Sequence, residues 1–242
     1  MLDTVIIGAG FAGLSAARTL MNEGRGNFVV LEARDRVGGR TKAGKIGDIS
    51  VDLGGMWMAP TQTRLKSLAA HYNVQAYPTY LDGNAIFRIG TRERQGPRED
   101  PSRLGIAGGL AYLFAKWNLE RPMARLDTNQ PWAHPQAKEL DATTVETWIA
   151  RNVYHPLARA AFRTICNSLL CAEPSQVSLL FFLHYVKSGG GLDVLISADA
   201  GGAQNLMFHG GVHQISRFMA DEIGDRLHLN APVMVIEWHD RG

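Results

Sequence analysis

The 242-residue chain has few cysteines, no long hydrophobic run and almost no excess of either charge. Its two cysteines, Cys166 and Cys171, are too few for a disulfide framework or a cysteine metal site, so we expect a reducing, cytoplasmic compartment. The longest apolar run, residues 5–14, is interrupted by glycines and is far shorter than the ~20 residues of a membrane span. A net charge of +2 gives no reason to expect nucleic acid as a partner.

Common catalytic and metal-binding patterns are also missing. His209 and His213 have the spacing of a helical metal pair, but Gly210 and Gly211 between them argue against one continuous helix, and no third ligand suggests itself. The chain has no nucleophile elbow and no pair of general-acid carboxylates. We therefore expect no metal and nominate no catalytic side chain.

The first forty residues predict a βαβ unit. Residues 4–7 form a short apolar strand that runs into a glycine-rich turn, a helical pattern follows, and a second apolar strand over residues 28–31 ends on Glu32. The three-glycine pattern alone is weak, because about 0.3 matches are expected by chance in a chain with 26 glycines. The flanking strand, helix and acid make it typical of dinucleotide binding, and a plain glycine-rich turn is the alternative.

Each glycine of this turn has a mechanical role in such a unit. Gly8 permits the tight turn, Gly10 lets the backbone approach a pyrophosphate, and Gly13 lets the helix lie close to the sheet. The first turn of the helix presents free N–H groups to the phosphates. The carboxylate of Glu32 would accept hydrogen bonds from ribose hydroxyls.

Beyond residue 40 the sequence predicts further short elements. Helical patterns cover residues 63–71, 110–118, 144–151, 156–170, 178–187 and 212–223. Short strands are expected at residues 49–53, 192–197, 205–208, 227–229 and 233–238. A weak pattern with five prolines between residues 79 and 141 indicates excursions of a second, cap-like domain.

Several strings are similar to one known family. Residues 29–41 (VVLEARDRVGGRT) and 52–55 (DLGG) resemble the flavin-containing amine oxidases, monoamine oxidases in particular. The strings at residues 171–173, 177–178, 185–190, 201–204 and 224–226 are similar to the same family. The resemblance runs from the first strand to the last residue, and it favours FAD over NAD, which the glycine pattern alone does not.

This resemblance implies an α/β fold, with a Rossmann-like FAD-binding domain and an inserted α+β substrate or cap domain. Residues 1–78 would form the first part of the FAD-binding domain, residues 79–205 the substrate domain, and residues 206–242 an incomplete return to the FAD-binding domain. Members of the family are considerably longer. We therefore expect this chain to be an N-terminal fragment, inactive alone.

The resemblance also implies a set of cofactor residues. Gly38 and Gly39 would leave the backbone open for Arg40 to lie over the diphosphate, and Gly54 and Gly55 would pass edge-on to the flavin ring. A surface role for Arg40 is the alternative. A structural hydrogen bond is at least as expected for Asp52 as a flavin contact. The predicted FAD residues are Gly8, Gly10, Phe11, Ala12, Gly13, Glu32, Ala33, Arg34, Gly39, Arg40, Thr41, Gly54, Gly55, Met56, Trp57 and Val233.

A substrate pocket is implied in the later helices and strands. An amide at Gln204 could orient an amine while aliphatic side chains exclude water, although each apolar member could equally be ordinary core. The residues that match the pocket of the family are Ser168, Leu169, Leu195, Ile196 and Gln204.

The function that the resemblance implies is FAD-dependent oxidation of an amine. A hydride would pass from the carbon next to nitrogen to flavin N5, the imine would be hydrolysed to a carbonyl product, and oxygen would be reduced to hydrogen peroxide. Two alternatives remain open. One is a flavin desaturase or porphyrinogen-type oxidase, and the other is a non-catalytic dinucleotide-binding module.

Overall fold

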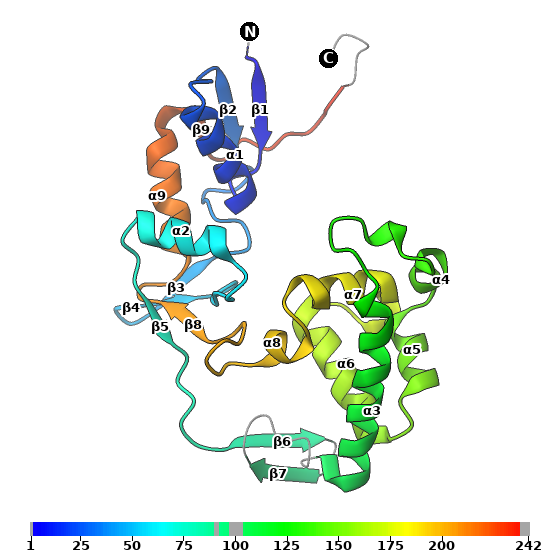
Figure 1. Ribbon diagram of the computed structural model, residues 1–242. Coiled ribbons are helices and arrows are strands. Elements are labelled where there is room, and N and C mark those ends of the chain that lie inside the picture. The colour runs from blue at the N-terminus through cyan, green and yellow to red at the C-terminus, as the bar shows by residue number, and fades with distance from the viewer. Residues whose placement is uncertain (1, 90–91, 97–103, 238–242) are drawn as a thin grey trace. The chain divides into compact units, whose positions relative to one another are not determined.

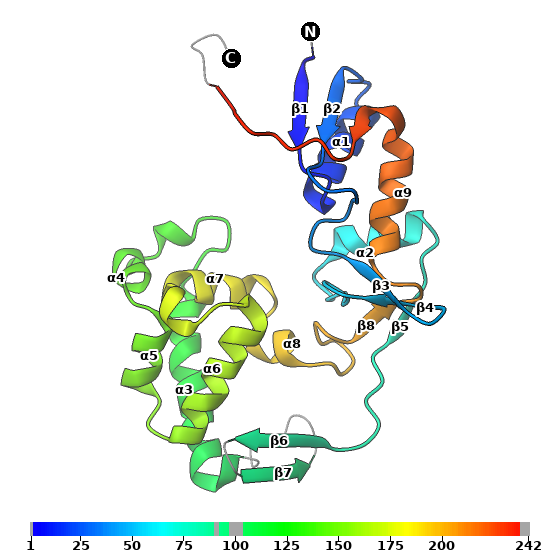
Figure 2. The same cartoon turned by 180° about the vertical axis from the view of Figure 1, so that it is seen from behind.

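The computed structural model describes residues 2–89, 92–96 and 104–237 (Figure 1, Figure 2). The chain divides into two compact units. The first comprises Met1–Met58, Gln62–Pro78 and Leu206–Gly242, and the second comprises Ala59–Thr61 and Thr79–Asn205. The first unit is thus assembled from separate stretches of chain, and each unit has its own hydrophobic core.

The first unit is built on a three-stranded parallel sheet in the order β1 (Thr4–Ile7), β2 (Phe28–Leu31) and β9 (Leu227–His228). The central strand β2 is a continuous apolar run, with its first three residues buried, as is usual for a strand inside a parallel sheet. In the register of the sheet, Val30 pairs with Leu227.

Two helices lie beside this sheet: α1 (Phe11–Asn22) and α9 (His213–Ile223) (Figure 1). Apolar residues at helical spacing give each helix one buried face, which includes Leu14 of α1 and Ile215 and Met219 of α9, all with no exposed area. Each such side chain contributes about 1.5–3 kcal/mol of hydrophobic stabilisation. This shared core fixes α9 against the glycine-rich end of the sheet.

The first unit also contains smaller elements. A hairpin joins β3 (Ala43–Ile46) to β4 (Ile49–Asp52), and an antiparallel pair joins β5 (Ala76–Pro78) to β8 (Leu206–Phe208). Helix α2 (Thr63–His71) lies between these pairs in the sequence.

A carboxylate links the three helices of this unit. Glu222 of α9 accepts from Arg18 of α1 at 2.5 Å and contacts His71 of α2 at 3.1 Å. Because these contacts are partly exposed, we expect them to orient the helices more than to stabilise the fold.

The second unit is mainly helical. Its core is formed by buried side chains from several helices, among them Leu119, Ile149, Phe162 and Phe182. The unit comprises β6 (Ala85–Ile89), β7 (Arg92–Gly96), α3 (Gly105–Ala124), η2 (Pro131–Ala133), α4 (Ala137–Ala142), α5 (Val145–Asn152), α6 (Pro156–Leu170), η3 (Pro174–Gln176), α7 (Leu179–Ser188) and α8 (Leu192–Ile196).

Two strand predictions are wrong. Residues 192–197 were expected to be a strand, but residues 192–196 form helix α8 because Leu192 and Leu195, one helical turn apart, are both buried. Gly189 makes this packing possible, since a Cβ there would lie 2.5 Å from the side chain of Leu195. The strand expected at residues 233–238 is absent over residues 233–237, where no neighbouring strand pairs with the chain. Residue 238 lies outside the described part.

Candidate functional site

The glycine-rich turn connects β1 to α1, and the structure explains each of its three glycines differently. Gly8 has a φ of +98°, which disfavours any side chain. A Cβ on Gly13 would lie 1.9 Å from the carbonyl oxygen of Gly8, so the close packing of helix on strand excludes one.

Gly10 differs from both neighbours. Its backbone conformation (φ −78°, ψ 177°) is open to any residue, and a Cβ would meet only the Cα of Gly39, at 3.9 Å. The polypeptide therefore leaves room for a methyl group at Gly10. The absence of a side chain there leaves an open space beside Gly10 at the start of α1, which we call the cradle.

Glu32, at the end of β2, is buried and bonded to this turn. Its Oε2 accepts the N–H of Ala9 at 2.8 Å and its Oε1 accepts the N–H of Arg34 at 2.9 Å. Burial alone would raise the pKa of Glu32, but the two N–H bonds and the positive charges of Arg34 and Arg36 outweigh it and lower the pKa below its ordinary value of 4.5. The side chain is thus ionised at neutral pH, and each oxygen has a lone pair left for a ribose hydroxyl.

A second glycine-rich loop crosses the first. The N–H of Gly38 donates to Ala9 O at 2.8 Å, and a Cβ on Gly39 would lie 3.3 Å from the Cα of Gly10. Both Gly38 and Gly39 have positive φ values, of +94° and +56°. Bare backbone from two loops therefore borders the cradle, and the exposed Arg40 follows on the second loop.

The loop that carries Arg40 is attached to α9. Thr41 Oγ1 donates to Gly38 O at 2.8 Å and lies 3.3 Å from Ser216 Oγ. His213 Nδ1 lies 2.8 Å from Thr41 O, to which it donates. Sequence reasoning missed this attachment and treated His213 only as a metal ligand to be rejected, because a bond across 172 residues leaves no local signal.

The segment predicted to pass the flavin ring has a reason of its own for being glycine. A Cβ on Gly54 would lie 2.1 Å from the carbonyl oxygen of Arg40, and Gly55 N–H donates to the same oxygen at 3.2 Å. Met56 is half-buried and Trp57 is exposed. The absence of a side chain at Gly54 is therefore required by the neighbouring chain itself.

Asp52, which precedes this segment, makes a structural hydrogen bond. Its two carboxylate oxygens lie 3.1 and 3.2 Å from the N–H of Val212, at the start of α9. Burial raises the pKa of Asp52, although the N–H bonds from Val212 and His213 and the charge of His213 oppose the effect. Of the two roles weighed for Asp52, the structure shows the hydrogen bond.

The remaining predicted cofactor residues lie in the first turn of α1, at the end of β2 and beyond β9. In α1, Phe11 is half-buried and Ala12 is exposed. Ala33 and Arg34 are exposed. The N–H of Ala231 donates to Glu32 O at 2.9 Å, so the chain after β9 crosses the end of β2 close to these residues. Val233, two residues further on, is exposed.

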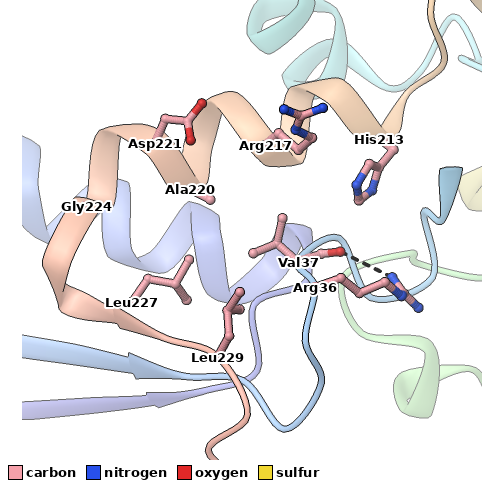
Figure 3. Close-up of a pocket in the computed structure, with 9 residues that line it drawn as sticks. All are labelled: Arg36, Val37, His213, Arg217, Ala220, Asp221, Gly224, Leu227 and Leu229. Atoms are coloured by element: carbon pink, nitrogen blue, oxygen red, sulfur yellow. Dashed lines mark hydrogen bonds between the residues drawn. The ribbon is translucent and has the colours of Figure 1, made fainter.

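A cavity of about 530 Å³ lies between α9, β9 and the loop after β2 (Figure 3). Within it, the guanidinium of Arg36 donates to the carbonyl oxygens of Val37 (3.2 Å) and Gly39 (3.1 Å), which braces the second glycine loop from outside. None of the predicted FAD residues lines this cavity, so we do not assign the cofactor to it. The lining residues are Arg36, Val37, His213, Arg217, Ala220, Asp221, Gly224, Leu227 and Leu229.

The predicted substrate residues all lie in the second unit. Gln204 Nε2 donates to Leu195 O at 3.3 Å, so the structure brings these two together. Leu195 is buried in the core, and Leu169 packs against the same core. Ser168 and Ile196 are exposed.

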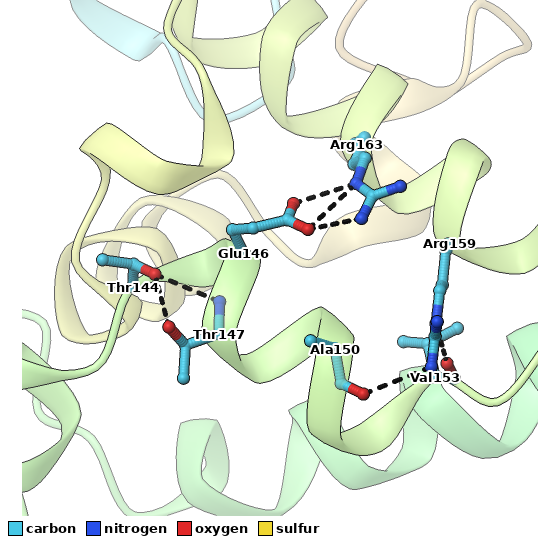
Figure 4. Close-up of polar contacts among 7 residues, drawn as sticks. All are labelled: Thr144, Glu146, Thr147, Ala150, Val153, Arg159 and Arg163. Atoms are coloured by element: carbon cyan, nitrogen blue, oxygen red, sulfur yellow. Dashed lines mark hydrogen bonds and ion pairs between the residues drawn. The ribbon is translucent and has the colours of Figure 1, made fainter.

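Helix α6, which carries Ser168 and Leu169, is held to α5 by polar contacts (Figure 4). Arg163 of α6 donates to the carboxylate of Glu146 on α5, with Nε to Oε2 at 2.9 Å. Arg159 Nε donates to Val153 O at 2.5 Å, at the C-terminal end of α5. These contacts orient the helix that carries two of the predicted substrate residues.

Clusters suited to a metal ion and helices suited to a membrane are both absent from the described residues. In that part of the chain no group of three or more His, Cys, Asp or Glu side chains is placed to hold a metal ion. Likewise, no helix within the described ranges is both long and apolar enough to cross a membrane.

The residues of the first unit fit an adenine dinucleotide. The open cradle at Gly10 can admit a pyrophosphate, the first N–H groups of α1 face it, and Glu32 is ionised beside it. Arg40 lies exposed on the adjoining loop. The arrangement can therefore bind two phosphates and a ribose.

The chain is similar to proteins of one known family. Residues 11–242 match the family model described as flavin containing amine oxidoreductase. A probable flavin-containing monoamine oxidase A of Dictyostelium discoideum is 36% identical over 239 residues, which cover 98% of this chain and 52% of that protein. The chain spans about half the length of the curated relatives it matches.

Solved structures agree. Cyclohexylamine oxidase from Brevibacterium oxydans has a TM-score of 0.85 and 33% identity, covering 96% of this chain and 51% of the other. Putrescine oxidase bound to putrescine has a TM-score of 0.86 and 28% identity, covering 99% and 53%. Together with the family match, these similarities confirm the predicted fold class and FAD as the predicted cofactor.

Proposed function

The chain belongs to the flavin-containing amine oxidoreductase family, and from this we propose that it is the FAD-binding part of an enzyme that oxidises an amine. The proposal depends on the open space at Gly10. Gly8 and Gly13 must be glycines for the fold, whereas Gly10 leaves an opening that the polypeptide does not use. A pyrophosphate that approaches the backbone would explain this opening.

The residues of the first unit would bind and orient the cofactor. Glu32 would accept the ribose hydroxyls, the N–H groups of the first turn of α1 would bind the phosphates, and Arg40 would neutralise their charge. Bound FAD would supply the redox chemistry, taking a hydride from the carbon next to the amine nitrogen and passing its electrons to oxygen. No side chain of the described residues is required as an acid or base for this step.

The substrate would be a small aliphatic amine. The similar solved enzymes are named for cyclohexylamine and putrescine, both of which are alkyl amines. In this chain the Gln204 side chain donates its N–H to the backbone carbonyl of Leu195, and its own amide oxygen can accept a hydrogen bond from an amine. A dry, aliphatic environment favours the neutral amine, which is the form that can lose a hydride.

The chain alone would bind FAD without turning over. Since it spans about half of its relatives, we propose that residues outside this sequence complete the catalytic centre. Incubation of the purified chain with FAD, a panel of amines and a peroxide detector tests this. We expect bound flavin and no peroxide. Steady peroxide release would contradict the proposal that the chain alone does not turn over.

Anaerobic addition of substrates to flavin-loaded protein that has been extended to the length of its relatives separates the alternatives, because flavin reduction requires the completed catalytic centre. Bleaching of protein-bound flavin by an amine would support amine oxidation, and bleaching only by substrates with reactive C–C or ring C–H bonds would favour a desaturase or porphyrinogen-type oxidase. Protein that retains no flavin after dialysis but binds NAD would favour a dinucleotide module. A matched pair of variants for the flavin-retention measurement is Glu32→Ala and Glu23→Ala, because Glu23 is exposed at the far end of α1.

A further inference from the structure

We propose that His213 is a positioning residue for the cofactor, because it holds the loop of Gly38 to Thr41 from helix α9. The inference rests on the proposed function, in which Arg40 on this loop contacts the diphosphate of FAD. His213 itself would not touch the cofactor, and it would act by fixing the backbone on either side of Arg40.

The imidazole of His213 fits closely against the loop. His213 Nδ1 lies 2.8 Å from Thr41 O, and because a carbonyl oxygen only accepts, Nδ1 carries the proton. A Cβ on Gly38 would lie 2.7 Å from Nδ1 and 2.6 Å from Thr41 O. The ring thus occupies the space that a side chain at Gly38 would take. The absence of that side chain also allows Gly38 its φ of +94°.

Helix α9 also holds the same loop at another point. Ser216, one turn after His213, has no exposed area, and its Oγ lies 3.3 Å from Thr41 Oγ1. Thr41 Oγ1 and the Thr41 N–H both donate to Gly38 O, at 2.8 and 2.9 Å. The turn is therefore closed on itself and attached to one face of α9 by two side chains.

Helix α9 is itself held by contacts at its start and along its apolar face. Its start is fixed by the bond from Val212 N–H to Asp52, and a Cβ on Gly211 would lie 2.7 Å from Asp52 Oδ1. Its apolar face, which includes Ile215 and Met219, is fully buried. A single rigid helix therefore sets the positions of the loop with Arg40 and of the strand end that leads to Gly54.

The test is the dissociation constant of FAD, measured by flavin fluorescence on the full chain well below its unfolding temperature. One hydrogen bond to a backbone carbonyl predicts roughly threefold to tenfold weaker binding for His213→Ala. His213→Asn, whose amide nitrogen can take the place of Nδ1, should restore most of the affinity. The control His209→Ala changes an exposed histidine that contacts the ring of Tyr77 and should leave binding unchanged.

A double-mutant cycle shows whether His213 acts through Arg40. If it does, His213→Ala should weaken binding much less in an Arg40→Ala background than in the wild type. Full additivity of the two changes would overturn the inference. An Arg40→Ala change without effect would instead refute the assignment of Arg40 in the proposed function.

Amide hydrogen exchange gives a second reading that needs no cofactor. In His213→Ala the amides of Gly38 and Thr41 should exchange at least several times faster, while that of Leu14, which donates to Gly10 O in α1, should not change. Unchanged exchange at Gly38 and Thr41, or equal FAD affinity of wild type and His213→Ala, would overturn the inference even if the chain binds FAD weakly.

Discussion

Substitution of Gly10 by alanine should separate cofactor binding from folding. In the structure a methyl group at this position would meet only the Cα of Gly39, at 3.9 Å, which is ordinary van der Waals contact. Its backbone angles suit alanine. Alanine restricts the unfolded chain, which stabilises by about 0.4–1 kcal/mol, but it is a poorer residue than glycine before a helix by a similar amount. The free energy of unfolding should therefore change by less than about 1 kcal/mol.

Binding of FAD should suffer much more. The methyl group would stand in the path of the pyrophosphate and lengthen its bonds to the N–H groups of α1. A hydrogen bond to a charged group contributes about 1.5–3 kcal/mol, so loss of one weakens binding roughly tenfold to hundredfold. Gly13→Ala is the matched contrast. Its Cβ would lie 1.9 Å from a backbone oxygen, and we expect it to destabilise the first unit by more than about 3 kcal/mol.

Two measurements decide this prediction. Urea unfolding followed by circular dichroism compares the stability of the variants without FAD, and fluorescence titration compares their affinity for FAD. If Gly10→Ala binds FAD as tightly as wild type, the cradle is not a phosphate site. If it unfolds the chain as Gly13→Ala does, the distinction between the two glycines is wrong.

Three further predictions concern other parts of the chain. Glu32→Gln should destabilise the first unit by about 1–3 kcal/mol at neutral pH. Because folding lowers the pKa of Glu32, the carboxylate contributes fully to stability above pH 4.5, and this contribution is lost as the pH falls through the pKa of the folded state. Urea unfolding at several pH values would show this loss. Burial raises the pKa of Cys166 to about 11, so at mildly alkaline pH an alkylating reagent should label the exposed Cys171 first, and equal labelling by mass spectrometry would contradict the packing of α6. Arg163→Ala should cost less than about 1 kcal/mol in thermal unfolding, because its ion pair is partly exposed, and a larger loss would show that the pair clamps α5 to α6.

Local patterns were sufficient for much of the fold. The strands at residues 4–7 and 28–31 and the helices at residues 63–71 and 156–170 have the bounds predicted from the sequence. In each, the apolar period and the flanking glycine, proline or polar residues agree. The resemblance to the amine oxidases did the rest, since it indicated the fold class and the cofactor.

The failures share one physical cause, which is dependence on partners outside the segment itself. Residues 192–197 have the composition of a strand, and only the space at Gly189 and the buried contacts of Leu195 make them a helix. The hairpin strand β3, which includes Gly44, was not predicted because its hydrogen bonds come from β4. At the site, His213 was overlooked because its partner, Thr41, is far away in the sequence.

The way in which the second unit interrupts the first has a consequence for biosynthesis. Val30 must wait for its neighbour in the sheet, Leu227, until the intervening residues 31–226 have been synthesised. The inserted unit emerges earlier, and its ends meet where Thr79 N–H donates to Asn205 O at 2.6 Å. Once it has folded, the long loop that separates β2 from β9 is closed in advance, and the entropy cost of completing the parallel sheet falls.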